Sequence, residues 1–451
     1  EVGASTWTIA VNNTITANVR EAYRFTKTIH FPTVGQYEIR VTKTSSDSTS
    51  SMVMDRLTWN SVVTHAVDAS GNYKSPVAED TADDILLMAL KIEASEQLTG
   101  TVSNLSVVET RWVNDYDVTT DSWVLRETHN PCSMYVDVLT NTVLNQNPIE
   151  FTDSYFNMGA LKAFHAWCAG DNDDSIEYTC NGVLSSETTL EQELQRIVST
   201  GRAEFSVMDG KYTVIQDIPQ DTPVQMFTSR NMLKDSFTAV RSFEKIPNKI
   251  IIEFVNADIG YKLDERVVQD ETATEVIEHS LVLDYIDNAD QAYALGKYML
   301  NSFQIQVYVY TFKASIDSLL VTKGDRILVQ HDSALLGQCS GRVQSIVESG
   351  GLITQLLVDE TCTMESGKEY GITVRNGSTM ETYKVDTLVG DNIVLVLDES
   401  VVSGNIDIGD LFSFGEYTKT VEDCIVENIS YDSDMNATIT AFMYSDDVYT
   451  L

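Results

Sequence analysis

Short runs of alternating apolar and polar residues, separated by turn residues, limit most strongly what this chain can fold into. Phe205 and Val207 lead into Asp209-Gly210, and a second alternating run follows. Asp-Gly suits a two-residue type I′ turn because both central residues need a positive φ. Residues 204–217 are therefore predicted to form a β-hairpin.

The same pattern, together with abundant Val, Thr, Ile and Tyr, predicts further strands. They are expected around Tyr37, Ile39 and Val41 and at residues 249–256, 304–313, 326–331 and 341–348, with a second hairpin at Asn376-Gly377. From residue 304 onward the predicted strands recur at short spacing, as they do in barrels and sandwiches.

Helical signals interrupt the strand pattern in four places. Asn130-Pro131 combines an N-cap residue with a proline at the first helical position, which predicts a helix over residues 130–141. A second helix is expected over residues 153–169, because Gly170 is a typical helix stop.

The third and fourth helices are predicted from capping signals. Thr188 and Glu191 fit a capping box, which predicts a helix over residues 188–199. A further helix is expected over residues 288–303, with Gln291 at the corresponding box position. Its buried stripe would consist of Leu295, Met299 and Phe303.

Together these elements predict a mainly β chain with an α+β insert. Residues 1–106 are expected to be all β, residues 107–218 to combine three helices with the 204–217 hairpin, residues 219–350 to place strands around one helix, and residues 351–451 to be all β.

Charge excludes several functional classes. The 451 residues contain 30 Lys and Arg against 67 Asp and Glu, a formal net charge of −37. A surface of this sign does not suit general binding to nucleic acid or to anionic lipid. With 43% hydrophobic residues the chain can build cores, so disorder is not expected. No apolar run approaches the about 18–20 residues of a membrane span.

Cysteine and histidine spacing gives no metal or cofactor signature. The six cysteines show no CxxC pair, so reduced and mostly buried thiols are expected. The nearest approach to a ligand set is His165, Cys168 and Cys180, for which core packing is the better explanation. No nucleotide-binding loop or nucleophile elbow is present, and we expect neither a cofactor nor an active site.

Several residue strings resemble a known family. Residues 31–41 resemble the P-x-x-G-x-Y/W-x-I-R-V strand of the tail tip attachment protein J family of long-tailed phages, also called host specificity protein J in lambda-like siphophages. Residues 89–98 resemble its A-L-x-I-x-A-x-x-L segment, which favours a strand at 85–94 over a helix. Asn130-Pro131-Cys132 resembles the start of its N-P-A helix, although Cys132 replaces the usual small residue.

The resemblance continues through the middle and end of the chain. Ala292, Gly296 and Lys297 fall on a helix similar to the family's A-x-x-L-G-R/K-Y segment. Residues 323–327 and 409–415 follow in the same order as in the family. Each string is short, but their order along nearly the whole chain makes the resemblance specific.

The resemblance implies a structural virion protein that forms the homotrimeric hub at the tail tip of a siphophage. Residues 1–106 would be a β-sandwich-like hub domain, 107–218 an α+β hub domain, 219–350 a β-barrel tube-type hub domain with one helix, and 351–451 a β-rich barrel or OB-like domain that closes the hub. A further hub segment would precede Glu1, and distal fibronectin-like and receptor-binding domains would follow Leu451.

The implied partners are those of a tail tip. The hub would link the distal tail tube to the central fibre, contact tail-tip assembly proteins, and hold the C-terminus of the tape-measure protein in its lumen. It would close the tube and open on host attachment, so that DNA is met only in transit and the receptor only through distal domains. Assembly would take place in the host cytoplasm. An acidic lumen would repel passing DNA.

Six residues are the expected ring interface. We hypothesise that the turn Lys323-Gly324-Asp325 and the helix stripe support contacts between subunits. Two alternatives remain open from the residues alone. A tail-associated glycan or peptidoglycan hydrolase would need paired carboxylates in a groove. A carbohydrate- or receptor-binding module could use Trp112, Tyr116 and Trp123, although packing is the simpler role for these aromatic residues.

Overall fold

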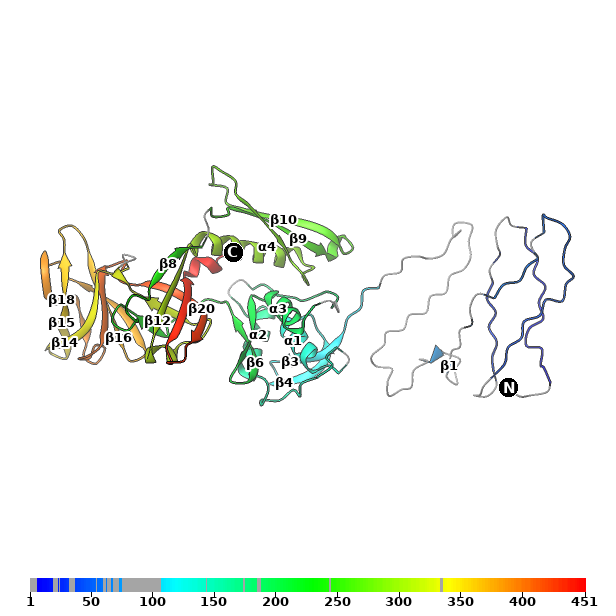
Figure 1. The fold of residues 1–451 in the computed structure, drawn as a ribbon, viewed down its shortest axis with the longest axis horizontal. Helices are drawn as coiled ribbons and strands as arrows, with labels where there is room; N and C mark the ends of the chain where they lie inside the picture. The colour runs from blue at the N-terminus through cyan, green and yellow to red at the C-terminus, as the bar shows by residue number, and fades with distance from the viewer. Residues whose placement is uncertain are drawn as a thin grey trace. The chain divides into compact units, whose positions relative to one another are not determined.

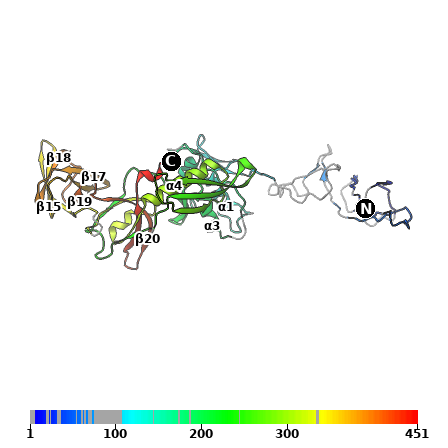
Figure 2. The same cartoon turned by 90° about the horizontal axis from the view of Figure 1, so that it is seen from above.

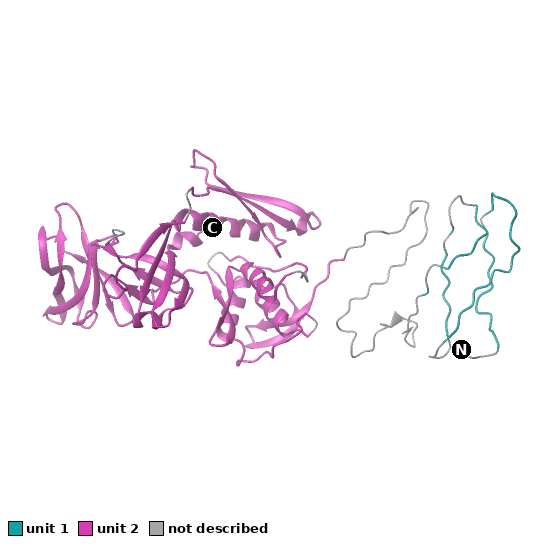
Figure 3. Cartoon of the chain, in the orientation of Figure 1, with its two compact units in different colours: residues 1–101 teal, residues 102–451 magenta. Residues whose placement is uncertain are grey.

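The fold was analysed in a computed structural model, which describes residues 6–18, 23, 25–31, 37–53, 55–59, 62, 66–67, 73–74, 107–142, 144–172, 175–184, 188–242, 245–332 and 336–451 (Figure 1). The chain divides into two compact units, residues 1–101 and 102–451, which Figure 3 shows in separate colours.

Unit 1 contains one short ladder among its described residues. Strands β1 (Ala66–Val67) and β2 (Tyr73–Lys74) pair antiparallel. The strand expected around Tyr37, Ile39 and Val41 is not formed, since no ladder in the described part of this unit includes them. A strand requires a hydrogen-bonded neighbour, and alternation alone does not supply one. The strand expected at residues 85–94 lies outside the described residues.

Unit 2 begins with an α+β region. Two hairpins lie at its ends, and the 204–217 hairpin is confirmed, with positive φ at both Asp209 and Gly210. The elements are β3 (Trp112–Asp117), β4 (Ser122–Glu127), α1 (Pro131–Thr140), α2 (Met158–Cys168), α3 (Leu190–Ser199), β5 (Ala203–Met208) and β6 (Lys211–Gln216).

Helix α1 is confirmed, but two helix starts were predicted wrongly. The Asn130 side chain accepts a hydrogen bond from the Cys132 amide, as an N-cap does. Helix α2 begins at Met158, because the residues before it bridge to Tyr212 of β6. The capping box of α3 is formed by Thr189 with Gln192, one residue later than predicted.

A long helix covers a small sheet in the next region. Sheet β10-β9-β11 consists of β9 (Lys249–Asn256), β10 (Lys262–Gln269) and β11 (Glu278–Val282). Helix α4 (Ala289–Ile305) packs on it and starts at the predicted cap, Asn288. The expected box residue Gln291 does not cap α4. Its side-chain amide donates instead to the carbonyls of Thr179 and Thr200, at 2.9 and 3.1 Å.

A six-stranded sheet combines segments from distant parts of the chain. Its order is β7-β13-β20-β21-β12-β8, and every neighbouring pair is antiparallel except β13 with β7. The strands are β7 (Gln225–Phe227), β8 (Thr238–Arg241), β12 (Tyr308–Ala314), β13 (Arg326–Val329), β20 (Glu422–Tyr431) and β21 (Ala437–Met443). Strand β12 begins four residues later than predicted because α4 continues to Ile305.

A closed six-stranded barrel lies between β13 and β20 in the sequence. Its order is β14-β15-β18-β17-β16-β19, and Figure 2 shows several of these strands gathered together. They are β14 (Cys339–Ser349), β15 (Leu352–Met364), β16 (Tyr370–Asn376), β17 (Thr379–Val385), β18 (Gly390–Val402) and β19 (Leu411–Glu416). Tyr370, Phe412 and Phe414 fill its core, and Asn376-Gly377 forms the predicted hairpin.

The observed fold confirms a mainly β chain with an α+β region and a small β-barrel. The expected boundary at residue 350 falls between β14 and β15, which are paired strands of the barrel. The four-domain division stays a prediction. Within the described residues, no helix combines the length and the apolar composition that a membrane span needs.

Candidate functional site

The stripe predicted on α4 packs inside the chain. Leu295 is buried in the core with Ile252 of β9, and Met299 and Phe303 pack against the same core. The Phe303 ring meets the His279 ring edge-on, with centroids 5.2 Å apart. The burial predicted for this stripe is confirmed for Leu295, whereas Met299 and Phe303 are partly buried. Its role between subunits stays a prediction.

The turn Lys323-Gly324-Asp325 lies on the six-stranded sheet, on a different element from the stripe. Lys323 Nζ lies 2.6 Å from Glu204 Oε1 on β5. Gly324 adopts φ +88° and donates its amide to the Val426 carbonyl at 2.7 Å. The Asp325 carboxylate accepts the Thr322 amide at 2.7 Å. These contacts join the turn to β20 and to the β5–β6 hairpin within one chain.

A buried arginine at the centre of unit 2 had no signal in the sequence. Arg202 is 4% exposed and lies over three aromatic rings. Its guanidinium carbon is 5.2 Å from the Trp167 centroid, 4.6 Å from that of Tyr298 and 5.1 Å from that of Tyr449. Such cation–π contacts are strongest where water is excluded.

Asp217 completes this arginine cluster. Its carbonyl accepts Arg202 Nη2 at 3.1 Å, and its carboxylate accepts the hydroxyl of Tyr449 at 2.6 Å and that of Tyr298. Tyr449 belongs to the C-terminal 3-10 turn η5 (Asp446–Tyr449). The cluster therefore connects α2, the β5–β6 hairpin, α4 and η5.

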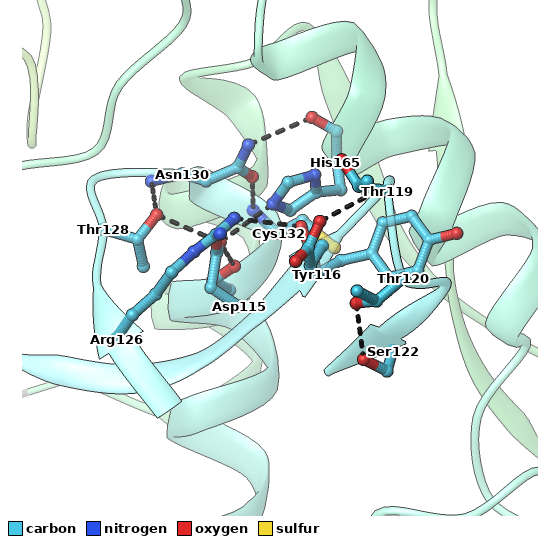
Figure 4. Close-up of polar contacts among 12 residues, drawn as sticks. Asp115, Tyr116, Thr119, Thr120, Ser122, Arg126, Thr128, Asn130, Cys132 and His165 are labelled. Atoms are coloured by element: carbon cyan, nitrogen blue, oxygen red, sulfur yellow. Dashed lines mark hydrogen bonds and ion pairs between the residues drawn. The ribbon is translucent and has the colours of Figure 1, made fainter. Parts of the chain in front are cut away.

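A second buried polar cluster surrounds Asp115 on β3 (Figure 4). Asp115 is 3% exposed. Its Oδ1 lies 2.8 Å from His165 Nε2 and accepts the hydroxyls of Ser133 and Thr128 at 2.5 and 3.0 Å. Arg126 Nε donates to Oδ2 at 2.6 Å. The network ties β3 and β4 to α1 and α2.

The electrostatics of this cluster favour the ionised carboxylate. Burial alone would raise the pKa of Asp115. Hydrogen bonds from His165, Ser133 and Arg126 outweigh burial and hold that pKa well below its usual value. The Ser133 hydroxyl donates to the Asp115 carboxylate rather than to an imidazole nitrogen, so the serine and the histidine do not contact each other as they do in a serine–histidine pair. The arrangement is suited to stabilising the fold.

Two of the three candidate sugar-binding aromatics pack against the interior. The rings of Tyr116 and Trp123 lie 5.5 Å apart, and Trp123 meets Phe151 edge-on at 4.9 Å. The Tyr116 hydroxyl donates to Asp121 at 2.7 Å. Trp112 is exposed on β3. Of the three aromatic residues, only Trp112 is largely exposed.

The candidate metal ligands are also part of the packing. Cys168 and Cys180 are buried, and burial raises the pKa of both thiols, to about 12 for Cys180. The His165 imidazole contacts Asp115, as described above. Within the described ranges, no three His, Cys, Asp or Glu side chains are grouped so that they could hold a metal ion.

The outer face of sheet β10-β9-β11 presents apolar side chains to solvent. Val255 lies opposite Leu263 and Ile251 opposite Val267, on the face turned away from α4. Leu263 is 67% exposed and Val267 is 50% exposed. Exposed apolar clusters of this kind commonly mark interaction surfaces. We call these four residues the outer-sheet face.

Two charged residues divide the outer-sheet face. Glu253 and Glu265 lie opposite each other between the two apolar pairs. Like charges placed directly opposite across a ladder destabilise the pairing. A cationic partner group would therefore be favourable at this position.

Family profiles match two parts of the chain. Residues 1–68 match the FNIII-A domain of tip attachment protein J. Residues 192–346 match a family described as putative phage tail protein. This second match includes α3, α4 and the sheet β10-β9-β11. A search of curated protein sequences found no match.

Solved structures of tail proteins align weakly with this chain. A tail protein from Neisseria meningitidis MC58 aligns at 10% identity over 65% of this chain and 68% of its own, with a TM-score of 0.32. The 43 kDa tail protein of prophage MuSo2 from Shewanella oneidensis aligns at 10% identity over 75% and 76%, with a TM-score of 0.29.

A third alignment is to a chain in the virion of a native gene transfer agent particle. It has 9% identity over 63% of this chain and 47% of that chain, with a TM-score of 0.33. The family matches do not depend on these alignments. In two segments, residues 1–68 and 192–346, the chain is therefore similar to families of phage tail proteins, the first of them the FNIII-A domain of tip attachment protein J.

Proposed function

We propose that this chain is a subunit of a homotrimeric hub at the tail tip of a siphophage. The observation that carries the proposal is the match of residues 1–68 to the FNIII-A domain of tip attachment protein J, together with the phage tail match at 192–346. The families are those of structural tail proteins. The hub would join the tail tube to the central fibre.

The proposed mechanism is mechanical. The hub closes the tube, holds the end of the tape-measure protein, and opens on host attachment so that DNA passes. A rigid scaffold suits such a part. The arginine cluster and the Asp115 network support this idea because each joins several elements of unit 2 through buried polar contacts.

We propose that the outer-sheet face is where a second copy of the chain docks. The apolar rows at Val255–Leu263 and Ile251–Val267 would be removed from water in the assembly. The opposed Glu253 and Glu265 would favour a cationic group of the second copy between the two apolar rows. Complementary charge of this kind would fix the register between copies. Leu295, Met299 and Phe303 would support this face from within each chain, and the turn Lys323-Gly324-Asp325 would be a separate contact between subunits.

We propose that the chain has no catalytic activity of its own. Support comes from the Asp115 network, where the serine and the histidine both contact one carboxylate rather than each other. A zymogram on peptidoglycan tests this point. Clearing of the substrate by the wild-type chain and its loss in Asp115→Asn would overturn it.

Labelling of intact particles tests the proposed location. Antibody raised against residues 102–451 and coupled to gold should bind at one end of the tail, distal to the capsid. An antibody against the major tail tube protein is the control and should label the full tail length. Label on the capsid, or particles that contain no such chain by mass spectrometry, would contradict the proposal.

A further inference from the structure

Two cysteine side chains of the barrel lie close to each other. Cys339 Sγ of β14 lies 3.2 Å from Cys362 Sγ of β15, and the two residues are 23 positions apart. Cys339 is partly exposed, whereas the other five cysteines are buried. A thiol pair at this distance is close enough to react if the strands can approach slightly.

The two cysteines lie just beyond the ladder that pairs β14 with β15. That ladder ends at the pair Val343 with Val358, four residues from each cysteine. Within a disulfide the two sulfur atoms are about 2.0 Å apart, so the Sγ atoms must approach each other from 3.2 Å for the bond to form.

Strands β14 and β15 are not paired with each other at the two cysteines. Cys339 pairs with Phe414 of β19, and Cys362 pairs with Asn392 of β18, so each thiol belongs to a different neighbour pair. Between them, the Arg342 amide donates to the Asp359 carboxylate at 2.6 Å. A covalent bond between the thiols would close this end of the β14–β15 pair.

The same end of the barrel contacts the six-stranded sheet. Arg230, in the turn after β7, donates to the Ser340 carbonyl at 3.2 Å and pairs with Glu360. Ser229 and Ser340 hydroxyls lie 3.0 Å apart. The thiol pair therefore lies beside the contact between the barrel and the six-stranded sheet, where a change in β14 and β15 affects both.

Reactivity differs between the cysteines. A hydrogen bond from the Cys362 thiol, helped by the charge of Arg230, lowers the pKa of Cys339. The pKa of Cys362 is raised by its hydrogen bond to Cys339 and by burial. Burial also raises the pKa of Cys424. Since the thiolate is the nucleophile, Cys339 should react first.

We propose that Cys339 and Cys362 form a dithiol–disulfide pair that small-molecule disulfides such as glutathione disulfide oxidise, joining β14 to β15 covalently. The cytosol keeps thiols reduced, and disulfides persist outside the cell. The proposal concerns the chemistry of the barrel and does not rest on the proposed tail-tip function.

The thiol–disulfide exchange with glutathione disulfide takes place in two displacement steps. The Cys339 thiolate attacks one sulfur of glutathione disulfide and releases one glutathione thiolate, which takes up a proton. The Cys362 thiol then loses its proton and attacks the Cys339 sulfur of the mixed disulfide, releasing the second glutathione. Two protein thiols are oxidised to one disulfide, and one glutathione disulfide is reduced to two thiols.

Peptide mapping tests the proposal directly. The folded 451-residue chain is incubated at pH 8 with glutathione disulfide, alkylated, digested without reductant and analysed by mass spectrometry. We expect one linked pair of peptides, containing Cys339 and Cys362, with a mass two hydrogens below their sum. The other four cysteines should be recovered alkylated after denaturation.

Single variants separate the two steps. Cys362→Ser should stop after the first step and carry glutathione on Cys339. Cys339→Ser should form neither product, and the matched control Cys424→Ser should form the linked pair as the wild type does. In the oxidised wild type, amide exchange at residues 339–342 and 359–362 should slow by about tenfold or more.

Three results would overturn the proposal. One is a wild-type chain in which all six thiols remain alkylatable after incubation with glutathione disulfide. Another is a folded chain that links a different pair of cysteines. The third is stable glutathione on Cys339 of the wild type without closure to Cys362, which would show that the strands do not approach.

Discussion

The guanidinium of Arg202 lies over the ring of Tyr449, so that a residue in the α+β region holds the C-terminal turn of the chain. Tyr449 in turn donates its hydroxyl to Asp217, which follows β6. Asn301 of α4 donates to the carbonyl of Thr450 at 2.7 Å, which fixes the same segment from a second side. The first and last parts of unit 2 are thereby joined through one buried cation.

Removal of this cation should weaken the fold. Arg202→Met keeps most of the side-chain volume but loses three cation–π contacts and the hydrogen bond to the Asp217 carbonyl. We expect a loss of about 2–4 kcal/mol in the free energy of unfolding, measured by urea titration. Arg196→Met, at a more exposed arginine on α3, is the control and should cost about 0.5 kcal/mol or less. Equal losses in both variants would contradict the role given to Arg202.

Stability should depend on pH through Asp115. The folded-state pKa of this carboxyl lies below its unfolded value, so the carboxylate stabilises the fold above about pH 4. This contribution is lost as the pH falls through the lowered pKa. Asp115→Asn should cost about 1–3 kcal/mol at pH 7, because it removes the charge of a buried carboxylate that accepts hydrogen bonds from Ser133, Thr128 and Arg126.

The difference between wild type and Asp115→Asn should also shrink in acid. Urea titrations at pH 7, 5 and 3 measure it. Glu127→Gln is the control, at an exposed carboxyl of the paired strand β4. A difference that stays constant from pH 7 to pH 3 would contradict the assignment of the acid-sensitive step to Asp115.

A glycine inside α4 is required by close packing. A Cβ on Gly296 would overlap the Ile252 side chain and approach Val268 Cγ2 at 3.1 Å. Gly296→Ala should therefore destabilise by about 1–3 kcal/mol, although alanine is the better helix former. Gly159→Ala on α2 is the control, since its nearest neighbour is 3.6 Å away, and it should be neutral or stabilising. Thermal melts of both variants measure the contrast.

The α4 stripe links the fold to the proposed assembly. Met299→Ala combined with Phe303→Ala removes packing beneath sheet β10-β9-β11 and should abolish the soluble trimer. Circular dichroism shows whether the monomer remains folded. Tyr293→Ala, on the exposed side of α4, should leave the trimer intact. A Met299→Ala, Phe303→Ala variant that still sediments as a trimer would refute this role.

Local signals in the sequence predicted local structure well. The N-cap Asn130 and the turns at Asp209-Gly210 and Asn376-Gly377 depend on neighbouring residues only, and all three are confirmed. The cap of α3 was placed one residue early because Thr188 and Thr189 both offer a hydroxyl. The choice depends on Gln192, whose side-chain oxygen accepts a hydrogen bond from the Thr189 amide.

Non-local relationships could not be predicted from the same signals. Strands β13 and β20 pair with each other although all six barrel strands lie between them in the sequence. Strand propensity does not show which strands pair. Arg202 meets Tyr298 and Tyr449 only after α4 and η5 have packed. Cys339 contacts Cys362 only when the six barrel strands have closed on one another. The relationship to phage tail proteins was indicated by the residue strings that resemble the tip attachment protein J family. Composition alone did not indicate it.

A substitution in the outer-sheet face tests the central claim, that copies of the chain assemble into a trimer. Leu263→Asp places a carboxylate in one of the two apolar pairs of that face, two residues from Glu265, and should prevent docking between copies without disturbing the core. Ile408→Asp, at a comparably exposed apolar residue between β18 and β19, is the matched control.

Sedimentation equilibrium of the 451-residue chain tests the trimeric hub most directly. The account predicts a wild-type mass three times that of the 50.2 kDa chain, a folded monomer for Leu263→Asp, and an unchanged trimer for Ile408→Asp. A wild-type chain that sediments as a monomer up to high micromolar concentration, or a Leu263→Asp variant that remains trimeric, would contradict it.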